Sequence, residues 1–197
     1  MKILFCSLSD RPEFSESIYE CNRRYYDKYN FDFIYEKKVL TSERHPSWSK
    51  IILLQEYLKK DYDYVIWIDD DIIIMNYDID FRDIITKYNP ESIMVDDNNN
   101  LGRWNINAGM IVCKNDEKTK EMLKEVWDNA KEEHYFGGVW ENDTMNELRD
   151  NYTIIPHRTM QSFKYCYRED DFSIHLAGIN PLEKRMKIRD EYLKKKS

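Results

Sequence analysis

Three consecutive aspartates, Asp69, Asp70 and Asp71, lie between two apolar runs of the sequence. Residues 64–68 are short, β-branched and aromatic, as in a buried parallel strand, and residues 72–75 resume the same character. The acids are therefore expected at the end of a strand. Three carboxylates held this close raise one another's pKa values, and the arrangement becomes favourable when a cation neutralises them. The cluster therefore predicts a bound divalent metal ion.

Glycine-rich phosphate loops are missing from the sequence. The five glycines are Gly102, Gly109, Gly137, Gly138 and Gly178, so the first 101 residues contain none. Neither GxGxxG nor GxxxxGK[ST] occurs, which excludes dehydrogenases and P-loop kinases. Because open α/β sheets bind ligands at the carboxyl ends of their strands, a nucleotide would have to be held there through the metal.

Composition narrows the class of protein further. The chain has 197 residues, enough for a single domain with a sizeable core. Its formal net charge is −7, from 37 acidic and 30 basic residues, so no overall positive field exists to hold a nucleic acid. The four cysteines form no CxxC pair, and reduced structural thiols are expected.

The hydrophobic pattern alternates between strands and helices. Strands at 2–7, 31–35 and 64–68 are separated by a helix that starts near Pro12 and by a helix over 47–60. This β-α-β-α-β order predicts an α/β fold with parallel strands. The later elements are expected as strands at 92–96, 108–114, 152–156 and 172–178, and as helices at 116–133, 141–148 and 181–195.

Four segments resemble one family of enzymes. The acidic cluster resembles the Asp-x-Asp metal motif of GT-A fold glycosyltransferases. HPSWSK at 45–50 resembles the H-P-x-W-x-K segment that precedes this motif in the galactosyl and xylosyltransferase family of the eukaryotic Golgi. NAGMIVCKN at 107–115 resembles its N-T-G-x-x-x-x-x-N, with Ala108 in place of threonine, and IHLAG at 174–178 resembles its H-F-A-G. The chain is also similar to small glycosyltransferase domains encoded by large DNA viruses.

The resemblance implies a GT-A (Rossmann-like) fold, a mixed, mainly parallel sheet flanked by helices in one domain. It also implies a metal site of Asp69, Asp71 and His175. Side chains alternate along a strand, so Asp69 and Asp71 point to one side and Asp70 to the other, where a turn or a local hydrogen bond is expected. A lone histidine is more often a satisfied core residue, but the match favours His175 as a ligand. Such an oxygen-rich set suits Mn²⁺ or Mg²⁺.

Contacts with the nucleotide sugar are expected from several further positions. Lys50 lies in the matched segment, although most helix lysines are solvated. Ser7, Ser9 and Arg11 follow the first strand, where GT-A enzymes hold the base and the ribose. The full set of expected donor contacts is Ser7, Ser9, Arg11, Lys50, Asp69, Asp70, Asn107, Ala108, Gly109 and Gly178.

The segment WENDT at 140–144 matches in position the family's acidic helix start, which holds the donor and acceptor sugars. Glu141, Asn142 and Asp143 are therefore the candidate catalytic residues. The alignment can slip by one position, so either acid can face the sugar. Asn142 or Asp143 would also cap a helix well, and both roles are compatible.

These features predict a metal-dependent hexosyl- or pentosyltransferase that moves a sugar from a UDP-sugar to a glycan or glycoprotein hydroxyl. The family's outcome is retaining, whereas an inverting enzyme would need Glu141 or Asp143 as base. Residues 1–100 would form the nucleotide-binding half and 101–197 the acceptor half of one domain. The alternatives are a nucleotide-sugar binding domain without turnover, and a haloacid-dehalogenase-type phosphatase, whose motif belongs to the first strand.

The expected location is the cytoplasm. The amino terminus has one lysine and a short apolar run that ends in polar residues, which fits neither a signal peptide nor a membrane span. If a virus encodes the chain, this would be the host cytoplasm. The chain is alternatively one domain of a longer, anchored protein.

Overall fold

The first half of the chain alternates strand and helix. The computed structural model describes residues 1–98 and 106–196. Its first elements are β1 (Ile3–Leu8), α1 (Pro12–Tyr29), β2 (Asp32–Glu36), the 3₁₀ turn η1 (Pro46–Trp48), α2 (Ser49–Tyr57) and β3 (Tyr64–Ile68). β1 pairs in parallel with both β2 and β3, which confirms the predicted β-α-β-α-β unit. Pro12 opens α1, where its missing N–H loses no helical hydrogen bond.

The central sheet has six strands in the order β2-β1-β3-β6-β5-β7. Its later strands are β5 (Ile93–Asp97), β6 (Ile106–Lys114) and β7 (Thr153–Ile155). β6 runs antiparallel to β3 and β5, whereas β7 is parallel to β5. The sheet is therefore mixed and mainly parallel, as expected.

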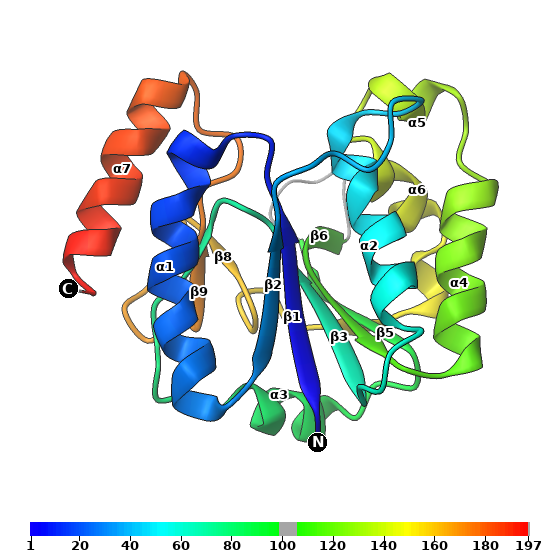
Figure 1. The fold of residues 1–197 in the computed structure, drawn as a ribbon, viewed down its shortest axis with the longest axis horizontal. Helices are drawn as coiled ribbons and strands as arrows, with labels where there is room; N and C mark the ends of the chain where they lie inside the picture. The colour runs from blue at the N-terminus through cyan, green and yellow to red at the C-terminus, as the bar shows by residue number, and fades with distance from the viewer. Residues whose placement is uncertain (99–105, 197) are drawn as a thin grey trace.

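Helices cover both faces of this sheet (Figure 1). Leu4 and Cys6 of β1 pack with α2 and with α4 (Glu117–Asp128) on one face, and Ile3 and Phe5 pack with α1 and with α3 (Phe81–Tyr88) on the other. Burial on both faces explains why β1 is apolar throughout rather than alternating. A further helix, α6 (Glu141–Glu147), follows α4 later in the chain.

A second, three-stranded sheet begins directly after the acidic cluster. Its strands are β4 (Ile72–Ile74), β8 (Ser162–Phe163) and β9 (Ser173–His175), in the order β4-β9-β8. β4 is antiparallel to β9 with Ile72 opposite His175, and β8 is parallel to β9 with Phe163 opposite His175. The helix α7 (Leu182–Lys194) shares an apolar core with this sheet and α1. This sheet brings His175 beside the acids.

Three elements differ from the sequence prediction. β8 and α3 were not expected, and the helix predicted over 116–133 ends at Asp128, with the short helix α5 (Glu133–Phe136) following separately. β8 has only two residues, too few for a periodic signal. α3 does carry a start signal, because the Asp80 side chain accepts the N–H of Arg82 at the helix N-cap.

Candidate functional site

A cavity of about 900 Å³ opens where β1 and β3 end. Its lining comes from the β1–α1 loop, η1, the acidic cluster, the start of β6, the start of α6, and the segments around β8 and β9. A ligand site at the carboxyl ends of parallel strands is the usual position in an open α/β sheet. Its size is that of a small-molecule pocket.

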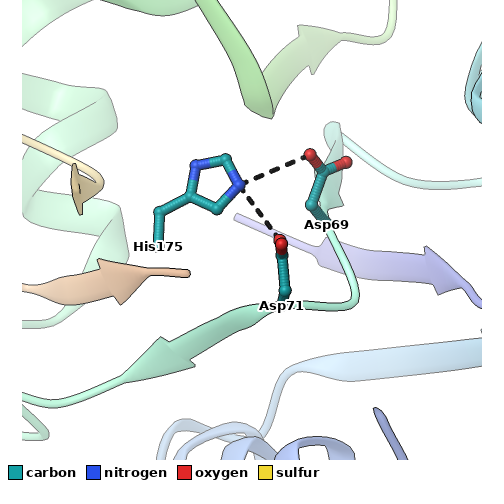
Figure 2. A group of neighbouring side chains, drawn as sticks. All are labelled: Asp69, Asp71 and His175. Carbon is teal, nitrogen blue, oxygen red and sulfur yellow. Dashed lines mark ion pairs between the residues drawn. The ribbon is translucent and has the colours of Figure 1, made fainter. Parts of the chain in front are cut away.

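Asp69, Asp71 and His175 all line this cavity, and their side chains point toward one another (Figure 2). Nε2 of His175 lies 3.0 Å from Oδ1 of Asp71 and 3.7 Å from Oδ2 of Asp69. One ligand atom from each residue lies within 4.8 Å of the others, and no other such group occurs among residues 1–98 and 106–196. The strand register explains the convergence, since the N–H of Leu176 donates to the carbonyl of Asp71 at 3.0 Å.

The donor set of this group fits a divalent metal ion. Nε2 of His175 is buried and has no hydrogen-bond partner that satisfies it, although it faces two carboxylates. A buried polar atom without a partner requires an explanation, and a bound ion is one of the ordinary ones. Two carboxylates and one imidazole suit Mn²⁺ or Mg²⁺, with further positions open to phosphate oxygens.

Asp70 points away from this group. Its carboxylate accepts hydrogen bonds from Oγ of Ser9 at 2.5 Å and from Nη2 of Arg11 at 2.6 Å. Burial, followed by the charge of Asp71, raises the pKa of Asp70 to about 6, although Arg11 and Ser9 act in the opposite direction. Asp70 therefore fixes the β1–α1 loop, the local role expected for it.

The acids keep the orientation of a strand although β3 ends at Ile68. The N–H of Asp69 still donates to the carbonyl of Gly109 at 2.8 Å, which extends the pairing with β6 by one residue. The N–H of Ile72 donates to the carbonyl of Asp69 at 3.2 Å and closes a turn. Although these residues lie in a turn, the side chains of Asp69 and Asp71 point to one side and that of Asp70 to the other, as the strand alternation predicted.

Lys50 lies buried beneath the acids. Its Nζ lies 3.1 Å from Oδ1 of Asp69, 2.7 Å from Oε1 of Glu141 and 3.0 Å from the carbonyl of Ala108. Burial alone would lower the pKa of Lys50, but Asp69 and Glu141 raise it above its ordinary value. An ammonium group has three N–H donors, and all three have partners here. A phosphate contact by Lys50 stays a prediction.

The other residues of the 45–50 segment have structural contacts. Trp48 is fully buried, and its Nε1 donates to the carbonyl of His134 at 3.0 Å. His45 accepts the N–H of Ser47 at the start of η1, and its ring stacks on Trp140 with centroids 3.7 Å apart and planes 3° apart. This pair forms one wall of the cavity.

Residues at the start of β6 contact the side chain of His175. Asn107 accepts the N–H of Gly109 at 2.9 Å, and its Nδ2 lies 3.5 Å from Nδ1 of His175. A Cβ at Gly109 would lie 2.5 Å from Cε1 of His175 and 2.4 Å from Oε1 of Gln161. Position 109 therefore has to be glycine so that the imidazole can lie against the backbone, a reason that the sequence did not suggest.

The two acidic residues at the start of α6 have different positions relative to the cavity. Glu141 and Asn142 line the cavity, and Oδ1 of Asn142 accepts the N–H of Ala108 at 2.9 Å. Asp143 does not line it, and its Oδ2 accepts the N–H of Val139 at 2.8 Å. Neither Asn142 nor Asp143 is the N-cap, which is Trp140, so the capping interpretation is wrong.

Of the remaining residues expected to contact the donor, some line the cavity and others do not. Arg11 and Gly178 border the cavity, and Gly178 has the positive φ of 72° that glycine tolerates best. Ser7 and Ser9 are buried and are not among the lining residues. The assignment of Ser7, Ser9 and Arg11 as donor contacts rests on fold position, and of these three only Arg11 lines the cavity.

Sequence reasoning missed Arg185. This residue of α7 lies 3.3 Å through Nη1 from Oδ2 of Asp71, and its Nε donates to the carbonyl of Ile179 at 2.9 Å. It lines the cavity together with Arg11, and both guanidinium groups lie over the ring of Phe14, at 5.9 Å for Arg185 and 5.3 Å for Arg11. The stretch EKRMKIRDE around Arg185 gives no signal that separates it from solvated helix positions.

The chain matches the model of the galactosyl transferase GMA12/MNN10 family over residues 6–102, just under half of its length. A comparison with curated protein sequences gives no match.

Solved structures of similar fold are glycosyltransferases. The enzyme involved in glycosylation of the major capsid of PBCV-1 is 19% identical with a TM-score of 0.79, over 99% of this chain and 100% of that one. The galactosyltransferase LgtC, in complex with donor and acceptor sugar analogs, is 9% identical with a TM-score of 0.55, over 99% and 96%. A Drosophila β-1,4-galactosyltransferase 7, in complex with manganese, UDP-Gal and xylobiose, is 14% identical with a TM-score of 0.52, over 90% and 72%.

Proposed function

We propose that the chain, which has a GT-A fold, is a glycosyltransferase that transfers a sugar from a UDP-sugar to a hydroxyl acceptor with a divalent metal ion. The observation that carries the proposal is the group of Asp69, Asp71 and His175, in which one ligand atom from each residue lies within 4.8 Å of the others. The Drosophila neighbour holds manganese and UDP-Gal, which supports the same pairing of metal and donor here.

Asp69, Asp71 and His175 would hold Mn²⁺ or Mg²⁺ through carboxylate oxygens and Nε2. When bound, such a cation supplies neutralisation of the negative charge that grows on the leaving diphosphate. Lys50 keeps Asp69 in place through its 3.1 Å contact. Arg185, which pairs with Asp71 at the edge of the cavity, is placed to donate to diphosphate oxygens as well.

We propose a retaining outcome in which Glu141 and Asn142 hold the donor sugar. One oxygen of Glu141 pairs with Lys50 at 2.7 Å, and the other, Oε2, is buried at the cavity wall without a partner. That oxygen can accept a hydrogen bond from a sugar hydroxyl. In a retaining reaction a donor phosphate oxygen takes the acceptor proton, so no side-chain base is needed. Asp143, turned to the loop, takes no part.

The test is metal-dependent cleavage of a nucleotide sugar. The protein is incubated with UDP-glucose, UDP-galactose or UDP-xylose, with Mn²⁺ or with EDTA, and released UDP is measured. We expect release with at least one donor and with Mn²⁺ only. The anomeric configuration of the first product, followed by NMR, should be that of the donor. Binding of UDP with Mn²⁺ but no cleavage of any donor would instead indicate a binding domain.

The strand order does not match that of a haloacid-dehalogenase-type phosphatase. In that class the Asp-x-Asp motif lies on the first strand, whereas here β1 and β2 both precede the acids. A phosphomonoester such as p-nitrophenyl phosphate is therefore the control substrate, and it should not be hydrolysed.

A further inference from the structure

A row of stacked rings leads to the surface from the metal group, the name used here for Asp69, Asp71 and His175. The register of β8 and β9 places the ring of Phe163 on the imidazole of His175, with centroids 5.3 Å apart and planes 13° apart. Tyr165 continues the row on Phe163, at 5.6 Å and 11°. All three side chains line the cavity. Three nearly parallel rings therefore extend from the expected reaction centre towards solvent.

The last ring of this row is unusually exposed. Tyr165 is 62% exposed, and of the exposed large apolar side chains in the described parts of the chain only it and Val139 line the cavity. Tyr165 belongs to none of the three hydrophobic clusters of the described residues, so packing of the core does not require a ring at this position. An exposed aromatic ring beside a ligand cavity is a feature typical of binding surfaces.

The backbone holds Tyr165 in place. It lies in a turn in which the carbonyl of Phe163 accepts the N–H of Cys166 at 3.0 Å and the N–H of Tyr167 at 2.9 Å. With the turn closed and one ring face on Phe163, the phenol loses little further freedom when a ligand covers its other face. Such preorganisation lowers the entropic cost of binding.

We propose that Tyr165, supported by Phe163, is the platform of the acceptor subsite and that the acceptor is a saccharide. The negative face of an aromatic ring attracts the C–H groups of a flat pyranose face. This inference rests on the proposed function, because it needs a donor at the metal group. The nucleoside is assigned to a different part of the lining, where Leu8, Asp10 and Arg11 border the cavity at the end of β1.

The experiment compares Tyr165→Ala, Tyr165→Phe and Phe136→Ala. Phe136 is 65% exposed but lies outside the cavity lining, so it controls for loss of a surface ring. Saturation-transfer NMR is recorded with UDP and Mg²⁺ present, using methyl glycosides of glucose, galactose and xylose and the disaccharide xylobiose as probes. N-acetylserinamide represents a protein hydroxyl. UDP affinity with Mn²⁺ is measured separately by calorimetry.

We expect at least one saccharide to bind the native protein through its ring C–H groups, and Tyr165→Ala to weaken that binding about tenfold. Tyr165→Phe and Phe136→Ala should stay near the native affinity, and UDP affinity should stay within twofold in all variants. A fall in UDP affinity in Tyr165→Ala would place the nucleoside on this ring and overturn the proposal. It is overturned as well if only N-acetylserinamide binds, if no saccharide binds, or if Tyr165→Ala binds saccharides normally. Failure of UDP and Mn²⁺ to bind the native protein would instead contradict the proposed function.

Discussion

The carboxylate of Asp71 lies between two basic side chains. Its carboxylate lies 3.0 Å from Nε2 of His175 and 3.3 Å from Nη1 of Arg185. Burial alone would raise the pKa of Asp71, but His175, Arg185 and Arg11 hold it below its ordinary value. These basic neighbours therefore favour the ionised form of Asp71.

Replacing Asp71 by asparagine should abolish metal-dependent turnover while the protein still folds. The amide keeps the shape of the side chain but removes the charge that would hold the cation. Electrostatic terms of this kind are worth about 3 to 4 kcal/mol, or on the order of 10² to 10³ in rate. Release of UDP from a UDP-sugar, at saturating Mn²⁺, measures the loss.

Asp70→Asn is the matched control, because Asp70 lies next in sequence but contacts Ser9 and Arg11 instead of the metal group. Its effect on turnover should be much smaller. If Asp70→Asn proved the more damaging of the two, the assignment of Asp69 and Asp71 as ligands would be wrong.

At the scale of elements, the site depends on how closely β9 approaches β6. The imidazole of His175 occupies the space that a side chain at position 109 would need, because a Cβ there would lie 2.5 Å from Cε1. Interiors are close-packed, so an added methyl group displaces its neighbours rather than filling a void. The geometry of the metal group is therefore set by a strand that supplies none of its ligands.

Gly109→Ala should weaken Mn²⁺ binding at least about tenfold, because the added carbon moves the imidazole away from the aspartates, and overpacking should cost about 1–3 kcal/mol of unfolding free energy. Calorimetric titration with Mn²⁺ and urea unfolding measure the two effects. Gly178→Ala is the control, since its Cβ would meet nothing within 4 Å but its φ is 72°. That variant should lose stability through backbone strain and keep its Mn²⁺ affinity. Equal Mn²⁺ affinities in both variants would contradict the packing argument.

At the scale of the whole molecule, the cavity joins the two predicted halves of the chain. His175 completes the group begun by Asp69 and Asp71, and Lys50 pairs with Glu141. The division into a nucleotide half and an acceptor half stays a prediction, and its boundary at 100/101 lies outside the described residues. Over the described parts, no helix is long and apolar enough to cross a membrane.

Because both halves contribute to one site, ligand binding should stabilise the whole fold. A ligand at about 100 times its dissociation constant adds about 2.7 kcal/mol, which is about 5–11 °C in Tm for a domain of this size. We expect this shift with UDP and Mn²⁺ together, and a much smaller one with UDP and EDTA, because the acidic site repels a bare diphosphate. Differential scanning fluorimetry measures it. In His175→Ala the added effect of Mn²⁺ should disappear, and its persistence would exclude His175 as a ligand.

The sequence by itself determined the local part of this protein. The period of apolar residues predicted the β-α-β-α-β unit, since each strand and helix buries its own pattern of side chains. It also predicted that the acids end a strand, and the order of four short motifs pointed to His175 as their partner. These features depend on neighbours in sequence or on short motifs whose order can be read along the chain.

Only the tertiary structure decided which side chains meet across long separations. It turned Glu141 to the cavity and Asp143 away, gave Lys50 three acceptors, and brought Arg185 to Asp71. It also formed the two-residue strand β8, and with it the row from His175 to Tyr165. The physical reason is that each of these contacts joins segments that are distant in the sequence. Such contacts depend on packing and on strand register, and neither packing nor register leaves a periodic signal in the residues that take part.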